Sequence, residues 1–243
     1  MRTPFLRLLS ASLASSVVLV GCAAPGWDGR VETWGEMRPV MREGQTEGRV
    51  RLSEVVRRSH AYGVGAVEGL DGEILIDDGR CWVARGRSSA SLDVIPDATT
   101  TNATLLIVAY VPEWTTISID RALPAESLDR FVRDAAERAG LETAQPFPFV
   151  IEGEFRDVAA HVVNGHCPLD GSPETADAEP FRVNEKAIRG TLIGFYARDS
   201  AGRLTHHGTE SHIHLLNRSP QVLVAHVETV GVAQGAVLRL PKR

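Results

Sequence analysis

The sequence predicts an α+β protein in which many short strands are combined with few helices. Most apolar residues occur in runs of strand length, and turn pairs such as Asp71-Gly72 and Asp78-Gly79 separate several of these runs. Only the segment 127–139 has a clear helical spacing of apolar residues. The chain has 243 residues, which is enough for one large domain or two small ones with an ample core.

The first 21 residues have the pattern of a bacterial lipoprotein signal peptide. Arg2 and Arg7 precede an apolar stretch that ends at Leu19-Val-Gly-Cys22, which resembles a lipobox. We therefore expect cleavage before Cys22, lipid modification of Cys22, and export to the cell envelope with the lipid as the only membrane anchor. A transmembrane helix is the weaker alternative, because the apolar run is shorter than the roughly 20 residues that a span needs.

Charge and cysteine content limit the partners and the redox state. The formal net charge of −5 argues against nucleic acid as a partner. Export would place Cys81 and Cys167 in an oxidising compartment, where they could form a disulfide. Two separate buried thiols are an equal alternative.

The stretch 22–45 is polar, so we expect a tether that leads into the first element. The alternation of small and apolar residues at 61–70 then predicts a strand, in which Gly63 and Gly65 suit the close approach of a neighbouring backbone. A continuous apolar run at 104–110 predicts a fully buried strand. The other elements expected in this part are a short helix at 52–59 and hairpin strands at 73–77 and 81–84.

The clearest helix is predicted at 127–139, with Ser127 as a candidate N-cap and Gly140 as a stop. From Phe147 the chain is β-rich again, apart from 164–180, where Gly, Pro and acidic residues predict a long surface loop. The expected strands of this part are 149–155, 158–163, 190–196, 210–216 and 221–230.

A His-x-His pair, His212 and His214, lies on one of these strands, and His226 lies on the next. Successive side chains of a strand point to opposite faces, so both imidazoles of the pair share one face. The turn-forming residues 217–220 predict a hairpin that brings His226 near the pair. Three histidines with an open fourth position are the ligand set of a catalytic zinc. Chance spacing of histidines is the alternative, and the adjacent residues 206 and 207 are an example of it.

Four parts of the sequence occur in a distinctive order. They are 63–79, which contains Leu-Asp-Gly-Glu, then Ile-Glu-Gly-Glu-Phe at 151–155, Gly-Thr-Leu-Ile-Gly-Phe at 190–195, and the three histidines. Together they resemble the α-acetolactate decarboxylase family, over a span from about residue 44 to residue 226. The resemblance implies an α/β fold with mixed sheets, few helices and two β-sheet-based domains, which we assign to 46–140 and 141–243.

The resemblance also implies a function. It implies that His212, His214 and His226 bind zinc, that Glu73 lines the active site, and that 2-acetolactate is converted to acetoin and carbon dioxide. Zinc on the ketone and hydroxyl oxygens can stabilise the negative charge left by loss of carbon dioxide. The product must then be protonated, and Glu73 is the candidate donor, with a solvent-facing hairpin glutamate as the alternative. The expected partner is thus a small β-keto acid, and we leave a homodimer open.

Two departures from the family pattern concern the part of the site that holds the substrate. His161 stands where the family has an arginine that is thought to engage the substrate's carboxylate, so we expect a catalytic contact there or, equally, a structural histidine. The family's second active-site glutamate, near its C-terminus, has no obvious equivalent before Arg243, and Glu228 is a weak substitute. The alternative function is therefore a metal- or ligand-binding lipoprotein of the same fold that has lost the chemistry.

Overall fold

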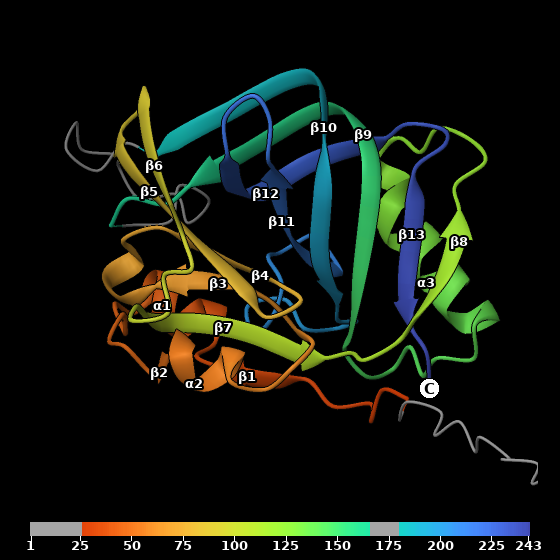
Figure 1. Cartoon of the computed structure of the whole chain (residues 1–243), viewed down its shortest axis with the longest axis horizontal. Helices are drawn as coiled ribbons and strands as arrows, with labels where there is room; N and C mark the ends of the chain where they lie inside the picture. Colours follow the sequence, from red (N-terminus) through yellow and green to blue (C-terminus); the bar gives the residue numbers. More distant parts are fainter. Residues whose placement is uncertain (1–25, 166–179) are drawn as a thin grey trace, which may run out of the picture.

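The computed structural model describes residues 26–165 and 180–243, which fold into two antiparallel sheets with few helices (Figure 1). The expectation of an α/β fold with mixed sheets is wrong, because every pairing between described strands is antiparallel. Short turns join many neighbouring strands, and such turns connect antiparallel strands, whereas parallel strands need a long crossover. The protein is therefore a mostly-β protein with two antiparallel sheets instead of mixed ones.

The first sheet is built from the N-terminal part of the chain. Its strands are β1 (Glu32–Trp34), β2 (Val50–Arg51), β3 (Ala61–Val67), β4 (Glu73–Asp77), β5 (Arg80–Ser88), β6 (Ser91–Pro96) and β7 (Asn102–Tyr110). They are ordered β1-β7-β3-β4-β5-β6, and β2 also pairs with β7. Gly65 allows β3 and β7 to approach closely as predicted, because a Cβ at this position would lie 2.0 Å from the carbonyl oxygen of Leu105.

The second sheet contains the two longest strands of the described structure, each of 16 residues. Its strands are β8 (Trp114–Ser118), β9 (Phe147–Val162), β10 (Phe181–Tyr196), β11 (Ser211–Asn217), β12 (Leu223–Val232) and β13 (Val237–Pro241). They are ordered β10-β11-β12-β9-β13-β8, and β10 also pairs with β9. The pairings β9–β10–β11–β12–β9 therefore form a closed circuit, and β9 and β10 arch together over the molecule in Figure 1.

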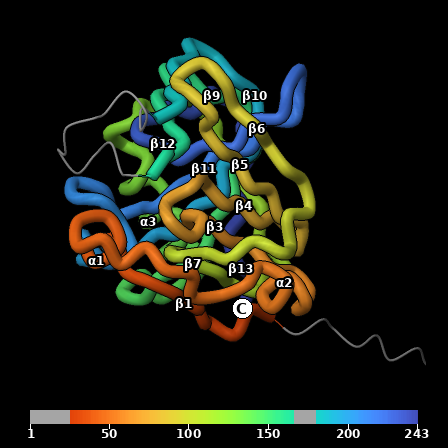
Figure 2. The backbone as a smooth tube through the Cα atoms, turned by 90° about the vertical axis from the view of Figure 1, so that its left-hand side faces the viewer, coloured from red at the N-terminus to blue at the C-terminus, as the bar shows by residue number. Residues whose placement is uncertain are grey.

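One large apolar core contains side chains from both sheets. Leu75 and Ile107 of the first sheet belong to the same buried cluster as Phe149 and Leu215 of the second. In Figure 2, β3, β4 and β7 of the first sheet lie below β9, β10 and β12 of the second. The helical elements are α1 (Met37–Arg42), α2 (Leu52–Val56), η1 (Glu68–Leu70), η2 (Ala125–Ser127) and α3 (Leu128–Arg138).

The helix predicted at 127–139 is α3, which ends before Gly140 as expected. Gly140 has a φ of +79°, the left-handed conformation that commonly stops a helix. The expected cap is only partly present. Ser127 occupies the N-cap position, but its hydroxyl donates a hydrogen bond to the carbonyl of Pro124 instead of accepting one from the helix.

Several predicted boundaries differ from the structure. The strands expected at 149–155 and 158–163 are one continuous strand, β9, and β10 begins at Phe181, well before residue 190. The stretch predicted as a tether contains β1 and α1. Residues 166–179, most of the predicted loop at 164–180, lie outside the described residues. The division into two domains near residue 140 stays a prediction.

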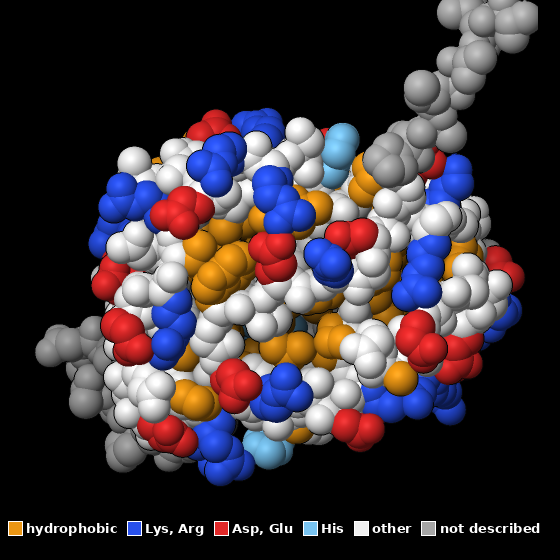
Figure 3. Space-filling view, turned by 90° about the horizontal axis from the view of Figure 1, so that it is seen from below, with side chains coloured by type: hydrophobic (Ala, Val, Ile, Leu, Met, Phe, Trp, Pro, Cys, Tyr) orange, Lys and Arg blue, Asp and Glu red, His pale blue; other side chains and the backbone are white. Residues whose placement is uncertain are grey.

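Cys22, in the leader, and Cys167 lie outside the described residues. Lipid modification of Cys22 and a disulfide between Cys81 and Cys167 therefore stay predictions. Cys81 is buried and has a free thiol. Within the part of the chain that the structure describes, no helix is both long and apolar enough to cross a membrane. On the face shown in Figure 3, acidic and basic side chains are interspersed around small hydrophobic areas.

Candidate metal centre

Three neighbouring strands bring the predicted histidines together. His214 on β11 is paired directly with His226 on β12, and His226 is in turn paired with His161 on β9. His212 lies two residues before His214 and so on the same face of β11. Side chains that are directly paired across antiparallel strands lie next to each other. The hairpin predicted from the turn at 217–220 is therefore what places the third histidine beside the pair.

His212, His214 and His226, here called the three-histidine cluster, have the geometry of a metal site. Each offers one ring nitrogen, and these nitrogens lie within 4.8 Å of one another. The Nε2 atoms of His212 and His214 are 3.1 Å apart. Two ligands bound 2.0–2.1 Å from one tetrahedral zinc would be about 3.3 Å apart. The cluster could therefore bind a metal ion.

Burial keeps the cluster uncharged. It lowers the pKa of His214 to about 3, and it lowers the pKa of His212 and of His226 well below the ordinary value, with neighbouring imidazoles adding to the effect. The Nδ1 atoms of His212 and His214 are buried without a hydrogen-bond partner among the described residues. Neutral imidazoles with a free lone pair are the form that binds metal.

Glu73 enters the same site from the first sheet. It begins β4, is 3% exposed, and its Oε2 lies 3.6 Å from the Nε2 of His214. Its Oε1 accepts a hydrogen bond from the backbone N–H of Val163. Burial raises the pKa of Glu73 to about 8, although that hydrogen bond opposes the shift. In the metal-free protein the contact with His214 therefore joins two neutral groups and is no ion pair.

His161 and Glu228 form a hydrogen-bonded pair beside the cluster. The Nδ1 of His161 is 2.7 Å from the Oε1 of Glu228, and the two imidazoles of His161 and His226 have ring centroids 5.0 Å apart. His161 is 1% exposed. The hydrogen bond from His161 lowers the pKa of Glu228, and Arg182 at 3.6 Å acts in the same direction. Because an ionised carboxylate only accepts, Nδ1 is the donor and Nε2 is left for another partner.

A small cavity of about 10 Å³, which is room for about one water molecule, adjoins these groups. Glu73, His161 and two members of the cluster line it on the polar side, together with His206. Met37 and Met41 of α1, Leu105 of β7, and Val163 just after β9 are among its apolar lining residues. None of the described residues that line it is Arg or Lys. The metal site therefore opens into a confined space that is partly apolar.

His206 is a site residue that the sequence did not reveal. Its ring centroid lies 4.9 Å from that of His226 and 6.4 Å from that of His212. It belongs to the irregular segment between β10 and β11, where no periodic pattern tells which way a side chain points. Met37 was missed for a similar reason, since it lies in the stretch predicted as a tether.

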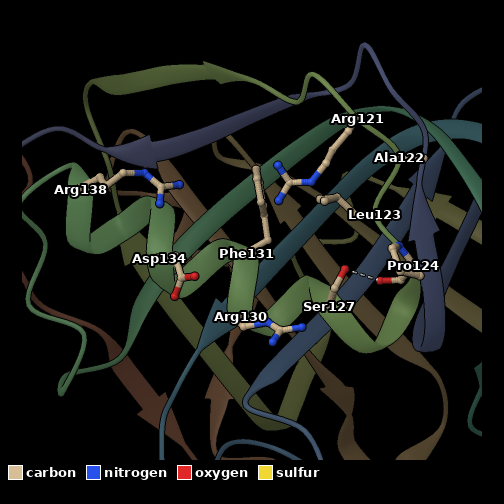
Figure 4. A pocket seen from close by; sticks show the side chains of 9 residues that line it. All are labelled: Arg121, Ala122, Leu123, Pro124, Ser127, Arg130, Phe131, Asp134 and Arg138. Atoms are coloured by element: carbon tan, nitrogen blue, oxygen red, sulfur yellow. Dashed lines mark hydrogen bonds between the residues drawn. The ribbon is translucent and has the colours of Figure 1, made fainter.

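A second hollow lies along α3 (Figure 4). Arg130, Phe131 and Arg138 of α3 and Arg121 from the preceding segment line it, and Figure 4 shows the side chains of Arg121 and Arg138 on either side of Phe131. It shares no lining residue with the histidine cavity. The described structure gives it no link to the metal site.

Comparison with protein families gives one match that covers most of the chain. The model described as "Alpha-acetolactate decarboxylase" matches residues 37–239. The matched span contains β2 to β12, Glu73 and all of the histidines described above. No curated protein sequence matches this chain.

Three solved structures share the fold. The chain is 19% identical to the alpha-acetolactate decarboxylase of Bacillus subtilis strain 168, with a TM-score of 0.69 over 88% of this chain and 86% of that one. It is 18% identical to the acetolactate decarboxylase of Bacillus subtilis subspecies spizizenii, with a TM-score of 0.67 over 88% and 86%. It is 17% identical to a Staphylococcus aureus protein of unknown function that is described as similar to alpha-acetolactate decarboxylase, with a TM-score of 0.64 over 87% of this chain and 85% of that one. At these identities the likeness shows the fold alone.

Proposed function

We propose that this chain, which belongs to the alpha-acetolactate decarboxylase family, is a zinc-dependent enzyme that converts 2-acetolactate to acetoin and carbon dioxide. One observation carries the proposal. A three-histidine cluster from the second sheet and a buried carboxyl group from the first sheet adjoin one small cavity. This combination supplies both a metal site and a proton donor to one cavity, which has to widen to admit a substrate.

The residues fit a catalytic zinc rather than a closed structural one. The cluster offers three neutral nitrogen ligands, which leave the ion its full charge and a fourth position for substrate. When bound, zinc would act as a Lewis acid on the substrate's ketone and hydroxyl oxygens. The remaining work falls to the side chains of the cavity.

Glu73 is suited to deliver the proton that the reaction consumes. Decarboxylation breaks the bond between C1 and C2 of 2-acetolactate and leaves the electron pair in an enediolate. Protonation at C2 then gives acetoin. Since burial raises the pKa of Glu73 to about 8, its carboxyl group holds a proton at neutral pH in the metal-free protein. The Val163 N–H fixes one of its oxygens and so orients the group.

His161 is the second proton-handling group in this proposal. With Nδ1 bound to Glu228, its imidazole is held in one orientation, as in other carboxylate–histidine pairs. Its Nε2 can then exchange a proton with the substrate's hydroxyl group. Histidine differs here from an arginine clamp, which could only donate.

The alternative is a metal- or ligand-binding protein of the same fold without the chemistry. A specific observation favours it, namely that no Arg or Lys lines the described cavity, so that a substrate carboxylate would find no fixed positive side chain. Both functions require a bound metal. They differ in whether 2-acetolactate is turned over.

We also propose that the protein acts in the cell envelope, anchored through a lipid on Cys22. The support is the sequence of the leader alone. Incorporation of a labelled fatty acid in vivo tests this, since a Cys22→Ser variant should lose the label. Labelling of that variant at the level of the unchanged chain would contradict the lipid site.

The experiment that separates the two functions measures acetoin. The full chain, loaded with zinc, is incubated with 2-acetolactate beside a His212→Ala control. We expect turnover that the control lacks. A rate no higher than that of the control would contradict the proposed enzyme activity and favour the alternative, a metal- or ligand-binding protein.

A further inference from the structure

The cavity contains one polar side chain that the proposed chemistry does not use. His206 lines it, yet within the described residues its imidazole has no hydrogen-bond partner. Glu73 and His161, by contrast, each have a partner, Val163 and Glu228. His206 is partly exposed, and both of its ring nitrogens are therefore free to bind a molecule that enters a widened cavity.

The backbone around His206 is fixed to the helix that covers the site. The N–H of Met37 donates to the carbonyl of Arg203 at 2.9 Å, and the N–H of Arg38 donates to that of Gly202 at 2.8 Å. An ion pair between Arg203 and Glu36, at 3.4 Å, adds to the link. Figure 2 shows this segment beside α1. The imidazole is thus presented by an anchored wall of the cavity.

The position of His206 differs from that of a metal ligand. Its ring lies 4.9 Å from that of His226, but its nitrogens do not belong to the group whose ligand atoms lie within 4.8 Å of one another. His161 also lies against His226, at 5.0 Å. The rings of His161 and His206 therefore both contact one member of the cluster and line the space next to it.

We propose that His206 binds the carboxylate of the substrate, a small 2-hydroxy acid, through an imidazole N–H. This inference rests on the proposed function for the identity of the substrate. A carboxylate in this cavity needs a donor, and the described lining residues include no Arg or Lys. The Nδ1–H of His161 is already used by Glu228. The proposed function reserves the Glu73 proton for C2, and the other histidines in the lining are candidate zinc ligands, so His206 is the lining side chain left to donate to the carboxylate.

The chain offers a matched control for this residue. His207 is its immediate neighbour, has the same side chain and is exposed. We would measure binding of 2-hydroxyisobutyrate to the zinc-loaded full chain by calorimetry. This acid keeps the hydroxyl and carboxylate of the substrate but has no ketone, so it cannot decarboxylate. His206→Ala should raise its dissociation constant roughly tenfold to a hundredfold, the range for a hydrogen bond to a charged group.

His207→Ala should bind the acid like the unchanged chain, and His206→Asn, which keeps an N–H donor, should restore part of the affinity. Unchanged affinity in His206→Ala would overturn the inference. So would a loss of zinc from this variant equal to that from His212→Ala, because His206 would then be a ligand. If binding depends on His206 but the chain makes no acetoin, the proposed function fails and the inference stands.

Discussion

Glu73 is the residue on which the proposed chemistry depends most. It is nearly inaccessible to solvent, and its pKa is raised to about 8 because burial disfavours the charged form. We expect Glu73→Gln to lower kcat for acetoin formation by about 10²- to 10⁴-fold, the usual contribution of a general acid. Zinc content, measured by atomic absorption, should stay unchanged.

A matched control for this substitution is Glu54→Gln, since Glu54 is exposed on α2. This variant should keep the full rate. If Glu73→Gln also kept the full rate, Glu73 would be a structural carboxyl group, and the proton would have to come from elsewhere.

The hydrogen bond between His161 and Glu228 leads to a separate prediction about kcat. Glu228 acts through His161, since the two are joined at 2.7 Å, and it is therefore a positioning residue. We expect His161→Asn and Glu228→Gln to reduce kcat, and the double variant to be little worse than His161→Asn alone, because residues that act as a unit are not additive. A double-variant cycle on kcat measures this. Strictly additive losses would mean that the pair does not work as a unit.

At the scale of single elements, β3 must pass close to β7. A Cβ at Gly65 would lie 2.0 Å from the Leu105 carbonyl oxygen, so Gly65→Ala forces the two strands apart. We expect it to lower the free energy of unfolding by about 1–3 kcal/mol, as overpacking does. Gly86→Ala in β5 is the control, since the nearest atom to its added Cβ would be 3.4 Å away. Equal midpoints in urea for both variants would refute the steric explanation.

The elements also show what could be predicted from sequence. The β11–β12 hairpin and its three histidines were predictable, because turn residues and two-residue alternation are local signals. The placement of α1 was not, since it depends on hydrogen bonds from Met37 and Arg38 to a segment more than 160 positions away. His206 was missed because it lies in the irregular segment between β10 and β11, where no periodic pattern indicates the direction of a side chain. The resemblance supplied Glu73, whose own sequence context suggested only a solvent-facing turn.

At the scale of the whole molecule, the two antiparallel sheets of the described residues differ from the expected mixed sheets. The alternation and turn signals predicted strands at β3, β4, β5, β7, β11 and β12, but none at β6, β8 and β13, and they do not encode how distant strands pair. The long strands β9 and β10 illustrate this. Their pairing extends over most of both strands, although apolar patterning marked only parts of each. Polar positions inside a strand interrupt the pattern without ending the strand.

The buried titratable groups predict how stability depends on pH in the metal-free protein. Burial lowers the pKa of His206 to about 4 and of His214 to about 3, and it also lowers those of His212 and His226, so below pH 6.5 the unfolded chain binds more protons than the folded one. Glu73, with its pKa raised from 4.5 to about 8, has the opposite effect, but it is one group against four.

Stability should therefore rise slightly as the pH falls from 8 to about 7, mainly through Glu73, and then decrease as the pH falls further towards 4, as the histidines of the unfolded chain bind protons. Urea unfolding midpoints of the metal-free chain, measured across this range, test the expectation. A midpoint that rises continuously down to pH 4.5 would contradict the burial of neutral histidines.

The central claim is that protonation at C2 takes place inside the histidine cavity under the control of Glu73. The most direct measurement is the enantiomeric composition of the acetoin formed from 2-acetolactate by the zinc-loaded full chain. We expect one enantiomer in large excess, because a donor fixed in a confined site reaches only one face of the enediolate. Racemic acetoin, formed no faster than without protein, would contradict the claim.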